Sequence, residues 1–331
     1  MTNPAALQKI EQARAEQWEE LDLSGMGLTE VPPEIGGLGE LRRLMIGKLH
    51  HGKLGFFGNR LTTLPKELFQ LQMLEELEMG FSHISVIPES IGQLVNLQIL
   101  GLINNEVGVI PESIGQLVNL QILDLTDNEV STIPESIGQL VNLRILRLGS
   151  NKITRIPDSL KELVNLQCLN LTDNQISIIP DEIGQLVNLQ TLNLDFNQIS
   201  VLPESVGQLA NLQRLILSFN QISVLPESVG QLANLNALGL NHNQISALPE
   251  VIKHLPKLDT PTAPIFTTTE DFSSSNKPSN RNSNASSLKA SPSPTNGSPS
   301  ATPSKTTAAT TSTTPNMKPF VGVMKSAIAP K

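Results

Sequence analysis

Apolar side chains recur along this chain at a fixed spacing. The pattern L-x-L-x-x-N-x-I-x-x-I-P-x-x-I-x-x-L-x-x-L-x-x starts again every 23 residues. A repeat of this length predicts a solenoid, in which each unit covers the apolar side of the next. Similar units begin at Leu21 and Leu54, which gives ten units over residues 21–260. The eight later units begin at Leu77, Leu100, Leu123, Leu146, Leu169, Leu192, Leu215 and Leu238.

Each unit opens with the short segment Leu-x-Leu, whose alternation predicts a β-strand with its leucines in the core. Successive strands lie parallel at a spacing of about 4.8 Å, so the rest of each unit must return the chain on the other side. Proline and glycine in that return, such as Pro111 and Gly115, disfavour a long helix. The sequence therefore predicts an α/β solenoid with a curved parallel sheet on the concave face and short helical or 3₁₀ turns on the convex face.

An asparagine follows the strand in eight of the ten units, and Met26 and Ser82 stand at this position in the other two. A carboxamide turned inward both donates and accepts hydrogen bonds, so it can satisfy backbone groups where the strand bends away. We therefore interpret this column as structural. Its members are Asn59, Asn105, Asn128, Asn151, Asn174, Asn197, Asn220 and Asn243.

The start of the chain departs from the repeat in two places. Residues 1–20 are predicted to form an N-terminal capping helix, with Leu7, Ile10 and Trp18 covering the open core of the first unit. Residues 44–53 are interpreted as an insertion, because the repeat pattern resumes at Leu54. This basic insertion contains two adjacent histidines and is a metal site, a partner-contact loop or a neutral insertion.

Residues 261–331 form a tail rich in Ser, Thr and Pro. Such a composition cannot bury enough apolar surface to fold, so we expect a disordered segment. The tail has seven Lys/Arg and two Asp/Glu, a balance of +5. Since the whole chain carries −8, residues 1–260 carry −8 − 5 = −13.

The strongly acidic repeat region favours a protein partner with a basic surface and disfavours nucleic acid. No apolar run approaches the roughly 20 residues of a membrane span, and the first 20 residues do not resemble a signal peptide. Cys168 is the only cysteine, so a disulfide cap within the chain is excluded. These features predict a cytoplasmic protein that does not bind membranes; they do not predict its oligomeric state.

No catalytic, nucleotide-binding or metal-binding motif is recognisable, and we expect a non-enzymatic protein without a cofactor. Side chains vary instead at the outward strand positions, where neighbouring units are otherwise nearly copies. This variation indicates either a binding surface or drift after duplication. The candidate partner-binding residues are Phe57, Phe81, Asp124, Asp127, Arg147, Asp173, Asp195, Phe196, Phe219 and His242.

Phe196 and Phe219 are the leading candidates, because they occupy the same position in successive units and should lie side by side near Asp195. Exposed aromatic side chains supply much of the energy at protein interfaces. The alternative is that the two rings shield the asparagine column.

The unit L-x-x-N-x-I-x-x-I-P-x-x-I-x-x-L-x-x-L resembles the Ras-group leucine-rich repeats, which are intracellular scaffolds. The opening WEELDLSGMGLTEVPPEIGGL is similar to the start of the repeat domain of cyanobacterial Roco proteins. The resemblance implies a leucine-rich repeat solenoid that acts as a scaffold, or as a regulatory subunit for a small GTPase or kinase. A third implication is the repeat portion of a Roco-like enzyme, although a tail stands here where that family has its GTPase module.

The tail is expected to be dispensable for folding, because few apolar side chains lie beyond Phe272. Limited proteolysis followed by mass spectrometry should remove most of residues 273–331 and leave a resistant repeat domain. Equal protection of the tail and the repeats would contradict this expectation.

Overall fold

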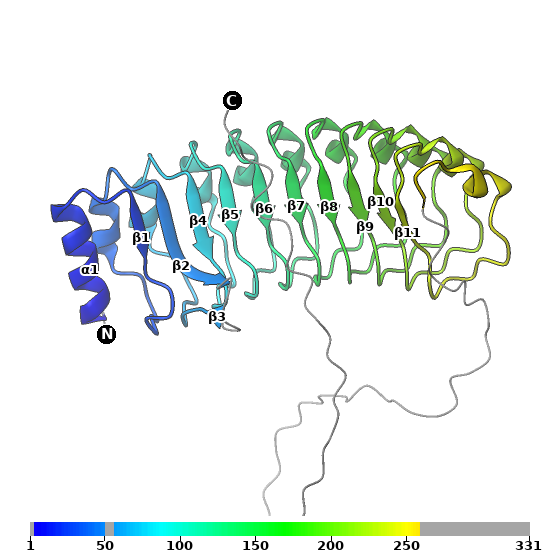
Figure 1. Cartoon of the computed structure of the whole chain (residues 1–331). Helices are drawn as coiled ribbons and strands as arrows, with labels where there is room; N and C mark the ends of the chain where they lie inside the picture. The colour runs from blue at the N-terminus through cyan, green and yellow to red at the C-terminus, as the bar shows by residue number, and fades with distance from the viewer. Residues whose placement is uncertain (1–2, 50–55, 259–331) are drawn as a thin grey trace, which may run out of the picture. The chain divides into compact units, whose positions relative to one another are not determined.

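The computed structural model describes residues 3–49 and 56–258. Over these residues ten strands lie parallel in one sheet, and the short β3 pairs antiparallel with β2. Figure 1 shows the strands in a single row, with the turns behind them. The predicted α/β solenoid is confirmed. The strands are β1 Glu20–Asp22, β2 Arg43–Leu49, β3 Phe56–Phe57, β4 Glu76–Met79, β5 Ile99–Gly101, β6 Ile122–Asp124, β7 Ile145–Arg147, β8 Cys168–Asn170, β9 Thr191–Asn193, β10 Arg214–Ile216 and β11 Ala237–Gly239.

The pairing of the strands follows the 23-residue period. Leu100 pairs with Leu123, and Leu123 with Leu146. Both leucines of a strand, such as Leu146 and Leu148, are fully buried. One continuous apolar core runs from Ala6 to Leu255. The predicted inward and outward positions are therefore confirmed, and each unit is stabilised by the units on either side of it.

The return segments contain short 3₁₀ helices, as predicted. A proline in an extended conformation precedes each one; at Pro111, φ is −70° and ψ is 152°. Because proline fixes φ near this value, the chain enters every turn in the same direction. The ten turns in the described part of the chain are Pro33–Gly37, Lys66–Gln70, Glu89–Gln93, Glu112–Gln116, Glu135–Gln139, Asp158–Glu162, Asp181–Gln185, Glu204–Gln208, Glu227–Gln231 and Glu250–His254.

The asparagine column is buried, except for the partly buried Asn151 and Asn243, and forms a ladder of hydrogen bonds. The Asn128 amide donates to the carbonyl oxygens of Leu102 and Leu125, at 2.9 and 3.1 Å. Its Oδ1 accepts the N–H of Val107 at 3.0 Å. Two of these partners belong to the preceding unit, so the side chain joins neighbouring units. It also provides hydrogen-bond partners for backbone groups at the bend after the strand.

The helix at the N-terminal end is shorter than predicted. Helix α1 spans Pro4–Ala15, with the Asn3 side chain accepting the N–H groups of Ala5 and Ala6. Its buried face consists of Ala6, Ile10 and Ala13. The prediction of a helix over residues 1–20 is wrong at its C-terminal end, because the chain turns after Ala15 and enters β1 at Glu20.

Helix α1 is attached to the first unit. The amide of Asn3 donates to the Met26 carbonyl at 2.9 Å, and Lys9 Nζ donates to the Asp22 carbonyl at 2.5 Å. In Figure 1 the helix lies beside β1, at the end of the sheet. These contacts hold α1 against the first unit.

The second unit begins ten residues earlier than predicted. Leu44 pairs with Leu21 on one side and with Leu77 on the other, so it is the strand leucine of this unit. The amide of Asn59 donates to the carbonyl of Ile46, which makes it the asparagine of the same unit. The strand leucine and the asparagine are 15 residues apart here and 5 apart in the units from Leu100 onward. The ten extra residues therefore lie between Ile46 and Asn59, and the predicted insertion at 44–53 is corrected.

Several expectations fall outside the described part of the chain. They concern Leu54, the adjacent histidines of the insertion, and the whole tail, because the structure describes nothing from residue 50 to 55 or beyond residue 258. Within residues 3–49 and 56–258, no helix is long and apolar enough to cross a membrane.

Replacing an inward leucine should destabilise the whole array. Leu148→Ala removes a fully buried side chain from a middle unit, so the free energy of unfolding should fall by roughly 2–5 kcal/mol. Chemical denaturation measures this change. The control Val141→Ala removes a 46% exposed side chain and should have little effect. An equal effect of the two substitutions would contradict the assigned core.

Candidate binding surface

The outward side chains of the strands form the open face of the sheet. Along its middle row, Asp124 and Arg147 form an ion pair with 3.4 Å between Oδ2 and Nη1. Both side chains are half-buried by their neighbours on the sheet. The structure therefore brings together two of the predicted candidates, and they satisfy each other's charge.

Glu78 lies in the same middle row and is strongly perturbed. Burial raises the pKa of Glu78 to about 7, and the negative charges of Glu76 and Asp124 add to the effect, while Arg147 opposes it. The neighbouring strand carries Gly101 at the paired position, and a side chain there would collide with the Glu78 carboxylate. The glycine thus allows the carboxylate to lie down on the sheet, where it loses contact with water.

A second row of side chains lies along the edge of the sheet, at the position just before the asparagine column. We call it the edge row. Its residues all have φ between +52° and +60°, the left-handed region that non-glycine residues rarely adopt. Hydrogen bonds between units hold this conformation; the Phe196 N–H, for example, donates to the Ser218 carbonyl at 2.9 Å. The edge row consists of Phe81, Asn104, Asp127, Ser150, Asp173, Phe196, Phe219 and His242.

Three rings at one end of the edge row are stacked. The centroids of Phe196 and Phe219 are 4.1 Å apart, with 9° between the ring planes. Those of Phe219 and His242 are also 4.1 Å apart, with 20° between the planes. Phe196 is 48% exposed and Phe219 is 41% exposed. We call Phe196, Phe219 and His242 the aromatic ladder; Phe196 and Phe219 lie side by side as predicted.

The predicted acidic residues have different partners. Asp127 accepts a hydrogen bond from the Asn104 amide, and Asp195 accepts the Ser218 N–H at 2.6 Å. Burial raises the pKa of Asp195, and its hydrogen bonds from Ser218 partly offset the effect. Asp173 is exposed, and its carboxylate has no hydrogen-bond or ion-pair partner within residues 3–49 and 56–258.

The remaining predicted residues lie elsewhere. Phe81 is in the edge row, beside Gly58 and far along the row from the ladder. Phe57 was predicted at an outward position of a parallel strand, and this placement is wrong because it belongs to the antiparallel β3. Its ring packs against Gly25 and is 41% exposed.

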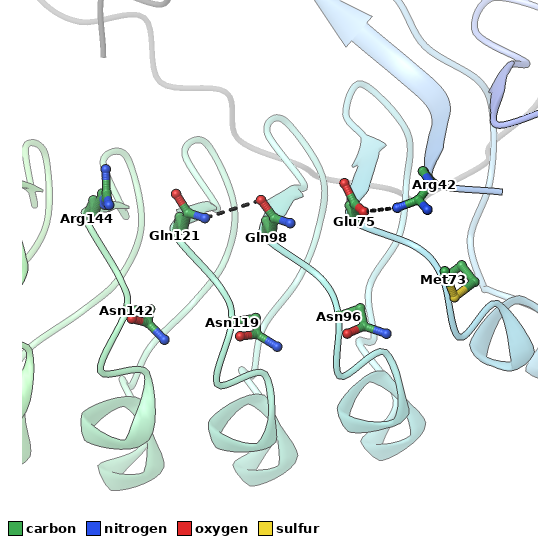
Figure 2. Close-up of a pocket in the computed structure, with 9 residues that line it drawn as sticks. All are labelled: Arg42, Met73, Glu75, Asn96, Gln98, Asn119, Gln121, Asn142 and Arg144. Carbon is green, nitrogen blue, oxygen red and sulfur yellow. Dashed lines mark hydrogen bonds and ion pairs between the residues drawn. The ribbon is translucent and has the colours of Figure 1, made fainter. Parts of the chain in front are cut away.

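The opposite edge of the sheet carries a polar groove of about 490 Å³, shown in Figure 2. Two rows of side chains line it. The lower row includes Asn119, whose amide donates to the Val95 carbonyl at 2.9 Å; in the upper row Gln121 donates to Gln98 at 3.3 Å. Arg42 and Glu75 form an ion pair at one end. The lining residues are Arg42, Met73, Glu75, Asn96, Gln98, Asn119, Gln121, Asn142 and Arg144.

Two features of the surface were missed in the sequence. The groove was missed because the asparagines that line it recur in nearly identical segments, which carry no sign of specialisation. The left-handed edge row was detectable, because Asn104, Asp127 and Asp173 are residue types that tolerate positive φ. Phe81, Phe196 and Phe219 stand at the same position of their units, where an asparagine or aspartate would be expected.

A family model described as a leucine-rich repeat region matches residues 89–171 and 158–259. These segments together cover more than half of the sequence, and the chain belongs to the leucine-rich repeat proteins. The search of curated proteins finds no significant match.

Solved structures of other repeat proteins are similar to this chain. A leucine-rich repeat protein of Leptospira interrogans is 38% identical, with a TM-score of 0.63 over 70% of this chain and 62% of that chain. The ectodomain of the Arabidopsis thaliana receptor kinase GASSHO1/SCHENGEN3, in complex with Casparian strip integrity factor 2, is 30% identical, with a TM-score of 0.61 over 69% of this chain and 28% of that chain. A plant peptide hormone receptor, RGFR1, in complex with RGF2, is 28% identical, with a TM-score of 0.52 over 66% and 38%. This chain therefore spans less than two thirds of the length of these relatives.

The raised pKa of Glu78 should make folding stability depend on pH. The folded state holds the Glu78 proton up to about pH 7 and the unfolded state only to about 4.5, so the contribution of Glu78 to stability falls as the pH rises between these values. Each unit of pKa difference corresponds to about 1.4 kcal/mol. Glu78→Gln should remove this dependence and raise the melting temperature at pH 8. Equal pH profiles of the two proteins, from thermal unfolding between pH 4 and 8, would contradict the assignment.

Proposed function

We propose that this protein is a non-catalytic binding module that holds a protein or peptide partner along the open face of its sheet, with the aromatic ladder at the centre of the contact. The observation that carries this proposal is the pair of stacked, half-exposed rings at Phe196 and Phe219, on a backbone conformation that disfavours them. The conformation recurs along the whole edge row, so the choice of phenylalanine over asparagine or aspartate is what distinguishes these two positions.

The energies of the ladder support a role other than folding. A left-handed conformation costs a non-glycine residue roughly 1–2 kcal/mol. The two phenylalanines together therefore cost roughly 2–4 kcal/mol, and the stacking of their one aromatic pair returns only about 0.5–1.5 kcal/mol. Asparagine or aspartate would avoid most of this strain, and Asn104, Asp127 and Asp173 occupy the same position in other units. Large exposed apolar side chains also supply the anchors of protein interfaces.

The relatives support the same class of function. Two of the similar structures are complexes of plant receptors, one with Casparian strip integrity factor 2 and one with RGF2. A row of outward strand residues that differ from unit to unit suits the recognition of one extended partner. The resemblance of the repeat unit to Ras-group repeats extends the proposal to an intracellular scaffold, since the single cysteine excludes an internal disulfide cap.

The proposal predicts that the ladder is needed for binding and not for folding. Phe196→Asn together with Phe219→Asn removes both rings and introduces a residue type that tolerates the local backbone. The full chain, used as bait in cell extract, identifies partners by mass spectrometry, and titration of each purified partner then gives its Kd. The double variant should bind at least about thirtyfold more weakly, which corresponds to about 2 kcal/mol. Its melting temperature should change by only a few degrees.

Phe81→Asn is the matched control, because Phe81 has the same backbone conformation in the same row but lies outside the ladder. It should weaken binding much less than the double variant, because Phe81 lies at the other end of the row from the ladder. Loss of stability without loss of binding in the double variant would show that the rings serve the fold, by shielding the asparagine column.

A further inference from the structure

The outer face of the Phe196 ring is the open end of the aromatic ladder. One face of this ring is covered by Phe219, at 4.1 Å. On the other side the same position of the preceding unit is occupied by Asp173, with the same backbone conformation. Backbone hydrogen bonds fix this neighbourhood, since the Asp173 N–H donates to the Asp195 carbonyl and the Asn174 N–H to the Phe196 carbonyl, at 2.8 and 3.1 Å.

An aspartate side chain is much shorter than a phenylalanine ring. The Asp173 carboxylate therefore covers only the base of the ring, and the outer part of the ring face stays in contact with solvent, in agreement with its 48% exposure. The site thus combines an aromatic face with a carboxylate at its inner edge. Asp173 has no partner for its charge in residues 3–49 and 56–258, whereas Asp127 accepts a hydrogen bond from Asn104 in the adjacent unit.

We propose that the exposed face of the Phe196 ring and the Asp173 carboxylate together bind an arginine side chain of the protein partner. We call this place the step. The inference rests on the proposed function and names the chemistry of its contact. A planar guanidinium can stack on the outer face of Phe196 in the layer that Asp173 occupies, and its N–H groups can donate to both carboxylate oxygens. A lysine ammonium lacks the planar face and the forked donors, so it satisfies only the charge.

The charge of the region agrees with a cationic occupant. Residues 1–260 carry 16 Lys/Arg and 29 Asp/Glu, a balance of −13. The nearest unit in the edge row toward the N-terminus carries the uncharged Ser150, and the one beyond it carries Asp127. The field at the step is therefore negative and attracts a guanidinium group from solution. Lys152 is paired with Glu129 and does not cancel it.

The test uses the full chain with isotope-labelled phenylalanine and two probes, acetyl-Arg-Arg-Arg-amide and acetyl-Lys-Lys-Lys-amide. Changes in the aromatic NMR signals during titration give the Kd of each probe. The arginine peptide should move the Phe196 and Phe219 signals and bind at least about fivefold more tightly than the lysine peptide. Asp173→Asn and Phe196→Asn should each weaken the arginine peptide by about fivefold or more. Both substitutions introduce asparagine, a residue type that tolerates positive φ.

Two controls separate this site from general attraction to an acidic protein. Asp127→Asn removes a charge from the same row, and Phe81→Asn removes a ring; each should weaken the arginine peptide by less than about twofold, because neither residue lies beside the Phe196 ring. Equal binding of the two peptides, or equal losses in Asp127→Asn and Asp173→Asn, would overturn the proposal. If partners lose affinity with Phe196→Asn and Phe219→Asn but not with Asp173→Asn, the proposed function stands and the arginine site is wrong.

Discussion

In eight of the ten repeats a buried or partly buried asparagine joins the repeat to the one before it. The carboxamide of Asn128 accepts the Val107 N–H and donates to the Leu102 carbonyl, both in the preceding unit, and also donates to Leu125 in its own. A buried backbone group left without a partner costs about 1–3 kcal/mol, so the bend after each strand is stable only when the neighbouring repeat is in place. Equivalent bonds recur as far as Asn243. The stacking of repeats, the parallel sheet and the continuous core all depend on this ladder.

The same bend determines the backbone at the edge of the sheet. The residue before each asparagine from Asn105 onward is held at positive φ by hydrogen bonds between units, whatever its side chain. A position whose conformation is imposed by its neighbours can accept an unfavourable residue without losing the fold. Phe196 and Phe219 occupy such positions, and the repeat distance brings their rings into stacking contact. The repeat therefore supplies a rigid frame for the aromatic ladder, and rigidity lowers the entropic cost of binding.

Charge and apolar surface are separated along the array. Glu78, Asp124 and Arg147 lie in the middle row of the earlier units, where burial and neighbouring charges raise the pKa of Glu78. The aromatic ladder lies in the later units, beside Asp173. A partner that extends along the sheet would meet both regions. Each repeat contributes only a few side chains to the surface. The surface can therefore select a partner whose charged and apolar groups follow in the same order as the repeats.

The sequence by itself determined the repeat, the strands, the turns and the buried asparagines, because a period of 23 residues leaves one consistent set of inward positions. It also identified Phe196 and Phe219 as neighbours, because residues one period apart occupy equivalent places. It misplaced the second unit, since Leu44 and Leu54 both match the pattern, and only the pairing of Leu44 with Leu21 and Leu77 decides between them. The helix end at Ala15, the burial of Glu78 over Gly101 and the parallel stacking of the rings were decided by the tertiary structure. Each of these depends on distances between units, which the order of residues within one unit does not contain.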